Sequence, residues 1–405
     1  MNGSSTSTWL YSLIWRAGSI SRGDLAQRTG LTKSTVSVSV DDLISRGLVQ
    51  EVGFRPSGTE GGRRAKLLEV NPNSHVVAGI HLGVRQTRVV IANAVGEELI
   101  VRERPTGRRS PAATLHQLGE LVLELCADLE VPRSRLAAVG VAIPGVVDQH
   151  AGACRIAPNL GWRDVAVAEI LRAVVAVPVR LNNTAQAMAV AEAHDAARHG
   201  ESGDLTLLYI GTGVGAASVS QGRLARGAHG FAGEIGHMAV GSGIECGCGN
   251  RGCLETLVSG PAIARRAAEL GIGTGRRGRT GSAELLGQAA LAGDPAARAL
   301  LETVGRELGE AAAWLVQVSN PRTLVVAGGV SELGDLLLTP LRQTLRERTM
   351  PGVYESLVVR RSLLDRRGKL RGAVLVALGQ LDDPTSRHHQ RSDVWFLSDR
   401  SVQTT

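Results

Sequence analysis

Apolar residues between positions 21 and 45 recur at three- and four-residue spacing, which is the period of an amphipathic helix. Ser21 and Thr32 each stand where a helix N-cap is favoured, and Gly30 separates the two stretches with a residue that accepts positive φ. The buried stripe of the second stretch is expected to consist of Val36, Val40, Leu43 and Ile44. Two short helices joined by a glycine turn predict a helix-turn-helix.

The next two apolar runs, "LVQEVG" and "AKLLEV", are predicted strands that enclose a glycine-rich basic segment. A basic hairpin beside a helix-turn-helix is a wing, which can lie along the phosphate backbone or in the minor groove of DNA. Short polar side chains and one cation stand near the start of the second helix and suit phosphates and base edges. The candidate DNA contacts are Lys33, Ser34, Thr35, Ser37, Arg55, Arg63 and Arg64. The alternative is a small protein-binding domain with a solvated charged loop.

Beyond residue 72, valine-rich runs alternate with alanine- and leucine-rich helical runs as far as residue 380. In runs such as "RLAAVGVAIPGVVDQ" and "NPRTLVVAGGVSEL", a strand-like stretch rich in β-branched residues is followed by a glycine turn. Such runs, alternating with helical ones, predict an α/β protein with helices on the sheet faces. Residues 381–405 lack an apolar period and are predicted to form a mobile tail. We therefore divide the chain into domains at 1–72 and 73–380 and a tail at 381–405.

The chain has 405 residues, of which 43% are apolar, and a formal net charge of +7. No apolar run approaches the ~20 residues of a membrane span. The N-terminus lacks the charged lead and apolar stretch of an export signal. We therefore expect a cytoplasmic protein without a membrane partner. The modest positive net charge permits nucleic-acid binding but does not establish it.

The segment "GTGVG" forms a glycine turn between strand-like runs. Its glycines leave backbone N–H groups open to an anion, which makes it a candidate phosphate loop. Tight strand turns use the same residues, so a purely structural turn is the alternative. The candidate loop residues are Gly211, Thr212, Gly213 and Gly215.

The order of the motifs in the body resembles the ROK family, which is named for repressors, open reading frames and kinases. The most specific pair of motifs is "AGEIGH" with "CGCGNRGCLE". The matching segments are "GVAIPGVVD" (140–148), "APNLGW" (157–162), "NTAQAMAVAE" (183–192), "GTGVG" (211–215), "GAHGFAGEIGHMAV" (227–240), "CGCGNRGCLE" (246–255) and "VVAGGV" (325–330).

This resemblance covers roughly residues 8–380. It implies an N-terminal winged helix-turn-helix followed by a two-lobed actin-like (ribonuclease H-like) sugar-kinase fold of the α/β class. A sugar would lie in the cleft between the lobes, with a structural zinc ion beside it. Members with the winged helix are mostly sugar-responsive regulators, usually dimers or tetramers, and members without it are mostly ATP-dependent hexose kinases. The implied partners are a double-stranded DNA operator, a sugar or sugar phosphate effector, and further copies of the chain.

Three of the five cysteines lie within eight residues of one glycine-rich loop. Cys246, Cys248 and Cys253 supply three thiolates, and His237 precedes the first of them by nine residues. Three cysteines and one histidine form a closed tetrahedral set, which is typical of structural rather than catalytic zinc. Three unbound thiols in a flexible loop are the alternative.

By the same resemblance, the residues that would contact the sugar are Asn159, Asn183, Glu234, His237 and Glu255. Carboxylates are good acceptors for sugar hydroxyls, and bidentate contacts discriminate epimers. The alternative is that Glu234 and Glu255 are surface charges near a metal loop.

Two positions depart from the kinase pattern of the family. The family's kinases place a catalytic Asp eight residues before a Glu, and counting back from Glu192 puts Thr184 at that position. His81 stands where the first phosphate motif has an Asp, and a neutral imidazole is a poor Mg²⁺ ligand. Arg85 follows in the same motif and could attract an anion. We therefore expect a repressor without enzymatic activity, and the alternative is an ATP-dependent hexose kinase with an appended DNA-binding domain.

Overall fold

The computed structural model describes residues 3–54, 65–107, 110–241, 243–272, 282–364 and 367–379. The predicted tail at 381–405 and the wing residues Arg55, Arg63 and Arg64 lie outside these ranges. None of the helices in the described ranges has the length and apolar character needed to cross a bilayer.

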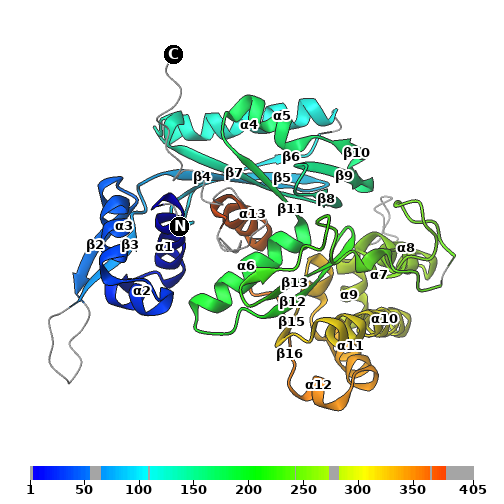
Figure 1. Cartoon of the computed structure of the whole chain (residues 1–405). Helices are drawn as coiled ribbons and strands as arrows, with labels where there is room; N and C mark the ends of the chain where they lie inside the picture. The colour runs from blue at the N-terminus through cyan, green and yellow to red at the C-terminus, as the bar shows by residue number, and fades with distance from the viewer. Residues whose placement is uncertain are drawn as a thin grey trace.

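Residues 3–54 and 65–70 form a winged helix-turn-helix, as predicted (Figure 1). Ser21 caps the second helix in a capping box with Asp24, Gly30 ends that helix at φ 69°, and Thr32 caps the third by accepting from the Thr35 N–H. A three-stranded antiparallel sheet of order β1-β3-β2 completes the domain. Its elements are α1 (Gly3–Ala17), β1 (Ile20–Ser21), α2 (Arg22–Thr29), α3 (Lys33–Ser45), β2 (Val49–Phe54) and β3 (Lys66–Val70).

The body contains two five-stranded sheets with the same topology. In each sheet the first strand along the chain lies in the centre, pairs antiparallel with the next strand, and pairs parallel with a strand that returns on its other side. The first sheet has the order β11-β7-β4-β5-β6 and the second the order β14-β13-β12-β15-β16. Two similar lobes therefore face one another, which confirms the predicted actin-like fold.

The strands of the first lobe are β4 (Val76–Leu82), β5 (Gln86–Asn93), β6 (Glu98–Pro105), β7 (Leu136–Ile143) and β11 (Val179–Asn183). A small sheet beside it consists of β8 (Val146–Asp148), β9 (Ala153–Ala157) and β10 (Trp162–Val165). The strands of the second lobe are β12 (Leu205–Ile210), β13 (Val214–Ser220), β14 (Arg223–Leu224), β15 (Thr323–Ala327) and β16 (Val358–Arg361).

Helices cover both faces of each sheet. The outer face of the first sheet packs on α4 (Pro111–Asp128) and α5 (Val167–Val175), and that of the second on α10 (Pro295–Ser319) and α11 (Asp335–Arg348). Between the sheets lie α6 (Thr184–Arg198) and α13 (Gly368–Leu378), as Figure 1 shows. The remaining helical elements are η1 (Arg133–Arg135), η2 (Pro158–Leu160), η3 (Ile235–His237), α7 (Glu255–Val258), α8 (Gly260–Glu269), α9 (Ala283–Leu291), η4 (Gly329–Leu333) and α12 (Pro351–Glu355).

The winged helix shares one hydrophobic core with the central helices of the body. Leu10, Tyr11 and Ile14 of α1 are fully buried in the same cluster as residues of α6 and α13. Trp15 donates from Nε1 to the carbonyl oxygen of Ala94 at 3.0 Å, and its ring lies 4.9 Å from the ring of His194 on α6. The winged helix therefore contacts α6 directly through Trp15 and shares a core with α13.

The close contact between α6 and α13 depends on glycine. A Cβ atom at Gly372 would overlap the backbone carbonyl of Ala187, which cannot move without displacing α6. We expect Gly372→Ala to lower the free energy of unfolding by about 2 kcal/mol or more, as overpacked cores do. Denaturant unfolding measures the loss. Gly352→Ala is the control, because its Cβ would meet open space, and an equal loss in both variants would contradict the contact.

Candidate functional site

A cavity of about 990 Å³ opens between the lobes and is lined by residues of both. It contains all five residues that the sequence proposes for sugar contact: Asn159, Asn183, Glu234, His237 and Glu255. Asn159 lies in η2, and Asn183 is the last residue of β11. Glu234 precedes η3, His237 ends η3, and Glu255 begins α7. The structure thus brings together residues that are separated by up to about a hundred positions in the chain.

Asn183 is held in place because it is both the last residue of β11 and the N-cap of α6. Its side-chain oxygen accepts from the Gln186 N–H at 2.8 Å, so the capping bond fixes the orientation of the amide. The amide nitrogen then points to Glu234 and donates to its Oε1 at 3.2 Å. The helix cap therefore positions the first carboxylate of the cavity.

The two glutamates are half-buried at the cavity wall. Burial raises the pKa of Glu234 to about 7, while the Asn183 hydrogen bond lowers it and the neighbouring Glu255 charge raises it further. Burial also raises the pKa of Glu255, against a hydrogen bond that its Oε2 accepts from the Val214 N–H at 2.8 Å. Carboxyl groups in such surroundings are strong hydrogen-bond partners for hydroxyl groups that displace water from the cavity.

His237, Cys246, Cys248 and Cys253 meet beside the glutamates, with their ligand atoms all within 4.8 Å of one another. The Cys248 and Cys253 sulfurs are 3.8 Å apart, and His237 Nδ1 lies 3.6 Å from the Cys246 sulfur. Thiolates bound at about 2.3 Å around a tetrahedral zinc ion are separated by roughly 3.8 Å, so the donor set and its spacing fit zinc. The predicted ligands therefore form a metal-sized cluster.

The ring of His237 joins this cluster to the cavity. Its Nδ1 faces the sulfurs, and its Nε2 lies 3.9 Å from Glu234 Oε2. The loop between the cysteines closes tightly because Gly249 and Gly252 adopt positive φ, at 99° and 76°. A metal ion held here would fix η3 on one side and α7, which begins at Glu255, on the other.

The "GTGVG" loop has fewer open donors than its sequence suggests. The N–H of Gly211 donates to the carbonyl of Gly213 within the loop, contrary to the expectation that it is open to an anion. The N–H of Val214 is taken by Glu255. Gly215 belongs to β13 and is paired with Tyr209 in the sheet. Thr212 and Gly213 line the cavity, and the Glu255 carboxylate lies against Gly213.

The two positions that depart from the kinase pattern also lie on the cavity. Thr184 is almost fully buried and offers no carboxylate there. Burial, with the nearby charges of Lys369 and Arg88, lowers the pKa of His81 to about 3, so its imidazole is neutral at physiological pH. Glu192 plays a structural part, because it is buried and accepts hydrogen bonds from Arg360 and the Leu363 N–H.

The candidate DNA contacts in the described part of the chain stand together at the start of α3. Lys33, Ser34 and Thr35 are exposed, and Ser37 is half-buried. Val38, which is not among the predicted contacts, is 71% exposed on the same helix and is a side chain of the type that contacts a thymine methyl group. Arg22 holds this helix in place through ion pairs with Asp41 and Glu51. The sequence signal for Val38 was an apolar residue on the polar face of a predicted helix.

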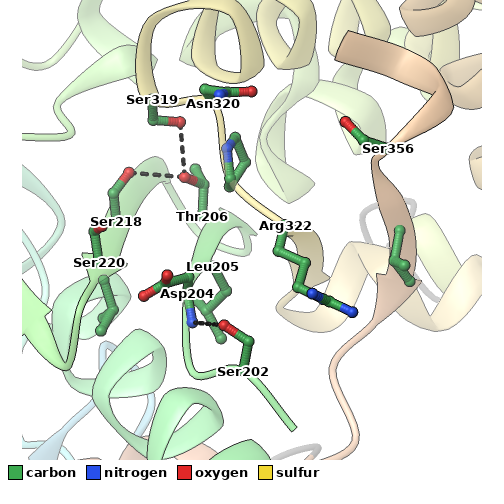
Figure 2. Close-up of a pocket in the computed structure, with 13 residues that line it drawn as sticks. Ser202, Asp204, Leu205, Thr206, Ser218, Ser220, Ser319, Asn320, Arg322 and Ser356 are labelled. Carbon is green, nitrogen blue, oxygen red and sulfur yellow. Dashed lines mark hydrogen bonds between the residues drawn. The ribbon is translucent and has the colours of Figure 1, made fainter. Parts of the chain in front are cut away.

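A second hollow, of about 590 Å³, lies at the start of β12 and the end of β13 and is lined mainly by polar residues, six of which carry hydroxyl groups (Figure 2). Its central hydroxyls bond mainly to one another, since Thr206 contacts Ser218 at 2.8 Å and Ser319 at 2.9 Å. A ligand would have to displace these bonds. The interlobe cavity, with its carboxylates and metal-sized cluster, is therefore the candidate functional site.

The fold and the site define a winged-helix protein with a sugar-kinase-like body and a histidine–cysteine cluster beside its cleft. The chain belongs to the ROK family, whose model matches residues 77–380, and a MarR family model matches residues 12–58.

Among its relatives is a putative xylose repressor of Caldicellulosiruptor sp. (strain Rt8B.4), which is 32% identical over 89% of this chain and 92% of the relative. A glucokinase of Halalkalibacterium halodurans is 30% identical but covers only 68% of this chain and 87% of its own length. A solved ROK family transcriptional regulator, described as a homologue of the E. coli MLC protein, superposes with a TM-score of 0.81 over 98% of both chains. At 24% identity, that likeness supports the fold alone.

Proposed function

We propose that this protein is a sugar-responsive transcriptional repressor that binds an operator through its winged helix and a sugar or sugar derivative in the interlobe cavity. The observation that carries the proposal is the shared core: α1 of the DNA-binding domain packs on α6, and α6 begins at the cavity. The relative named as a xylose repressor matches over both domains, which supports the same assignment.

The cavity is proposed to recognise its ligand without phosphorylating it. Phosphoryl transfer to a hydroxyl requires a base near that hydroxyl and oxygen ligands for Mg²⁺. Thr184 and His81 occupy the two positions where the family's kinases carry these carboxylates. The competing function, an ATP-dependent hexose kinase with an appended domain, would need a base elsewhere in the cavity.

We infer that the cluster of His237, Cys246, Cys248 and Cys253 holds a structural zinc ion. Zinc bound by three thiolates and an imidazole contributes folding free energy and has no open coordination position. The four residues would thereby hold Glu234 and Glu255 at a fixed separation across the cavity.

Helix α6 is proposed to carry the signal from the cavity to the DNA-binding domain. Its N-cap, Asn183, contacts Glu234, and its other end contacts Trp15 through His194. A ligand that favours one angle between the lobes shifts an existing equilibrium and moves this helix relative to the first sheet. In a homodimer or homotetramer, such movement changes the separation of two α3 helices on successive major-groove faces.

Trp15→Phe tests this route. Phenylalanine has a smaller ring, which loses part of the contact with the His194 ring on α6, and it cannot donate to Ala94. We therefore expect sugar affinity to hold while the sugar-induced change in operator affinity falls about fivefold, which corresponds to a loss of ~1 kcal/mol. Fluorescence anisotropy on operator DNA, with and without sugar, measures both quantities. Trp314→Phe, on the exposed face of α10, is the control. Full coupling in Trp15→Phe would argue against α6 as the route.

The function itself is tested by incubating the full chain with DNA from its own upstream region, a sugar panel and ATP. We expect sequence-specific binding that one sugar or sugar derivative weakens, and no sugar-dependent ADP release. Sustained ADP release that follows the sugar, from protein free of contaminating kinases, would favour the hexose kinase instead. Binding to all DNA with equal affinity would remove the repressor assignment.

A further inference from the structure

A cluster of amide side chains lies behind the cavity wall, at the start of α6. Gln186, in the first turn of α6, is fully buried, and Gln149, in the turn that follows β8, is half-buried. The Nε2 of Gln149 donates to Gln186 Oε1 at 2.9 Å and also to Asn182 Oδ1. Among the described residues, the cavity lining includes Asn183 but neither of these glutamines. The cluster can therefore act on a ligand only through the residues that it holds in place.

Two hydrogen bonds of this cluster reach the second lobe, in the segment that leads from β14 to η3. Gln186 donates from Nε2 to the carbonyl oxygen of Gly230 at 3.0 Å. Arg226 donates from Nε to Gln149 Oε1, so a charged donor of the second lobe bonds to an amide of the first. The segment lies close to the first lobe here, since a Cβ at Gly230 would stand 3.0 Å from the carbonyl oxygen of Val147. The two glutamines therefore join the lobes at one place.

The same cluster controls the amide that reaches into the cavity. Gln186 and Asn183 form a capping box, in which the Asn183 N–H donates to Gln186 Oε1 at 3.3 Å and the Gln186 N–H donates to Asn183 Oδ1 at 2.8 Å. The Asn183 amide therefore keeps the orientation from which it donates to Glu234 Oε1 at 3.2 Å. This bond also crosses between the lobes, because Glu234 lies at the end of the segment that begins at β14.

These contacts favour one angle between the lobes, and a sugar bound to Glu234 would favour another. At the angle of this structure, Oε1 of Glu234 already accepts from Asn183. An angle that separates these two residues leaves that oxygen free for a sugar hydroxyl. A ligand shifts an equilibrium by its difference in affinity for the two states, so such a sugar opposes the hydrogen bonds of the cluster.

We propose that Gln149 and Gln186 form a latch between the lobes, which holds the angle that binds operator DNA and opens when a sugar engages Glu234. The inference rests on the proposed repressor function and assigns two positioning residues to its ligand switch. A hydrogen bond from a charged donor changes an equilibrium by roughly 10- to 100-fold, which is an amount that the contacts of one bound sugar can outweigh.

Gln149→Met tests the latch, because methionine keeps the length of the side chain and removes both of its polar groups. Sugar binding should become about tenfold tighter, since the open form that binds sugar becomes a larger fraction of the protein. Operator affinity should stay equal or fall, and less sugar should release the DNA. Damage to the fold would instead weaken both kinds of binding. Gln343→Met is the matched control, because the Gln343 amide is exposed on α11 and pairs with Glu347 of the same helix.

A double-mutant cycle isolates the contact between the lobes. Arg226→Met should also tighten sugar binding, and the double variant should add little to the effect of Gln149→Met, because both substitutions remove the same hydrogen bond. Calorimetry of the full-length, zinc-loaded protein with D-xylose, D-glucose, N-acetyl-D-glucosamine and their phosphates measures sugar affinity. Fluorescence anisotropy on DNA from the protein's own upstream region measures operator affinity. Fully additive gains would place the two residues in separate interactions and overturn the latch.

The outcomes separate this inference from the proposed function. Release of operator DNA by one of these sugars, with equal or weaker sugar binding in Gln149→Met, overturns the latch and leaves the repressor standing. A natural chain that binds neither the upstream DNA nor any of the six probes defeats both.

Discussion

Cys248→Ser is expected to reduce bound zinc from about one ion per chain to a small fraction of that and to abolish sugar binding with it. Serine oxygen is a poor zinc ligand, and the three remaining donors cannot close a tetrahedral site. The Cys248 and Cys253 sulfurs stand 3.8 Å apart, so loss of one ligand opens the loop between Cys246 and Cys253. That loop leads directly into Glu255, whose carboxylate holds the Val214 N–H.

Elemental analysis and thermal unfolding of the same samples measure the effect of Cys248→Ser. Cys126→Ala is the control, because Cys126 is buried in α4 and far along the chain from the metal cluster. It should keep its zinc even if it loses some stability through the small cavity it creates. Full zinc content and normal sugar binding in Cys248→Ser would show that the cluster neither holds a metal nor supports the cavity.

Glu234→Gln is expected to weaken sugar binding by roughly 10- to 100-fold, with little change in operator affinity in the absence of sugar. The glutamate oxygens can only accept when ionised, and Asn183 already donates to one of them at 3.2 Å. A glutamine places an NH₂ group in the same space, so either the Asn183 amide or the sugar hydroxyl loses its acceptor. The substitution should change sugar affinity rather than operator affinity, because the recognition helix α3 lies in the other domain.

Calorimetric titration with the effector measures this loss, and Glu245→Gln is the matched control. Glu245 belongs to the same metal loop, but its side chain is 79% exposed and pairs with Arg251 at the surface. An unchanged effector affinity in Glu234→Gln would exclude the carboxylate from the binding site. An equal loss in both variants would point to a general effect on the loop.

The sequence predicted best those features that depend on neighbouring residues. Caps at Ser21 and Thr32 and the left-handed Gly30 identified the helix-turn-helix because capping acts within three or four residues of the backbone. The metal cluster was also recognisable, since three of its four ligands lie within eight positions and glycines allow the loop to close.

The sugar candidates were identified only through resemblance to a family. Asn159, Asn183, Glu234 and Glu255 come from four separate segments of the chain, and no local period relates them. The same holds for the two lobes, whose sheets share one topology although the chain contains no fixed-period repeat. A fold can be duplicated without a visible sequence repeat because many apolar sequences fill equivalent core positions.

The sequence by itself therefore determined three features: a capped helix-turn-helix, an α/β body and a compact set of candidate zinc ligands. Only the tertiary structure decided that Lys369 lies close to both His81 and Tyr209, that the Gly211 N–H is hydrogen-bonded within its own loop, and that Trp15 contacts α6. The physical reason is the distance along the chain over which each interaction acts. Capping, periodicity and ligand spacing act over a few residues, whereas charge balance and domain coupling depend on segments that meet only when the whole core has packed.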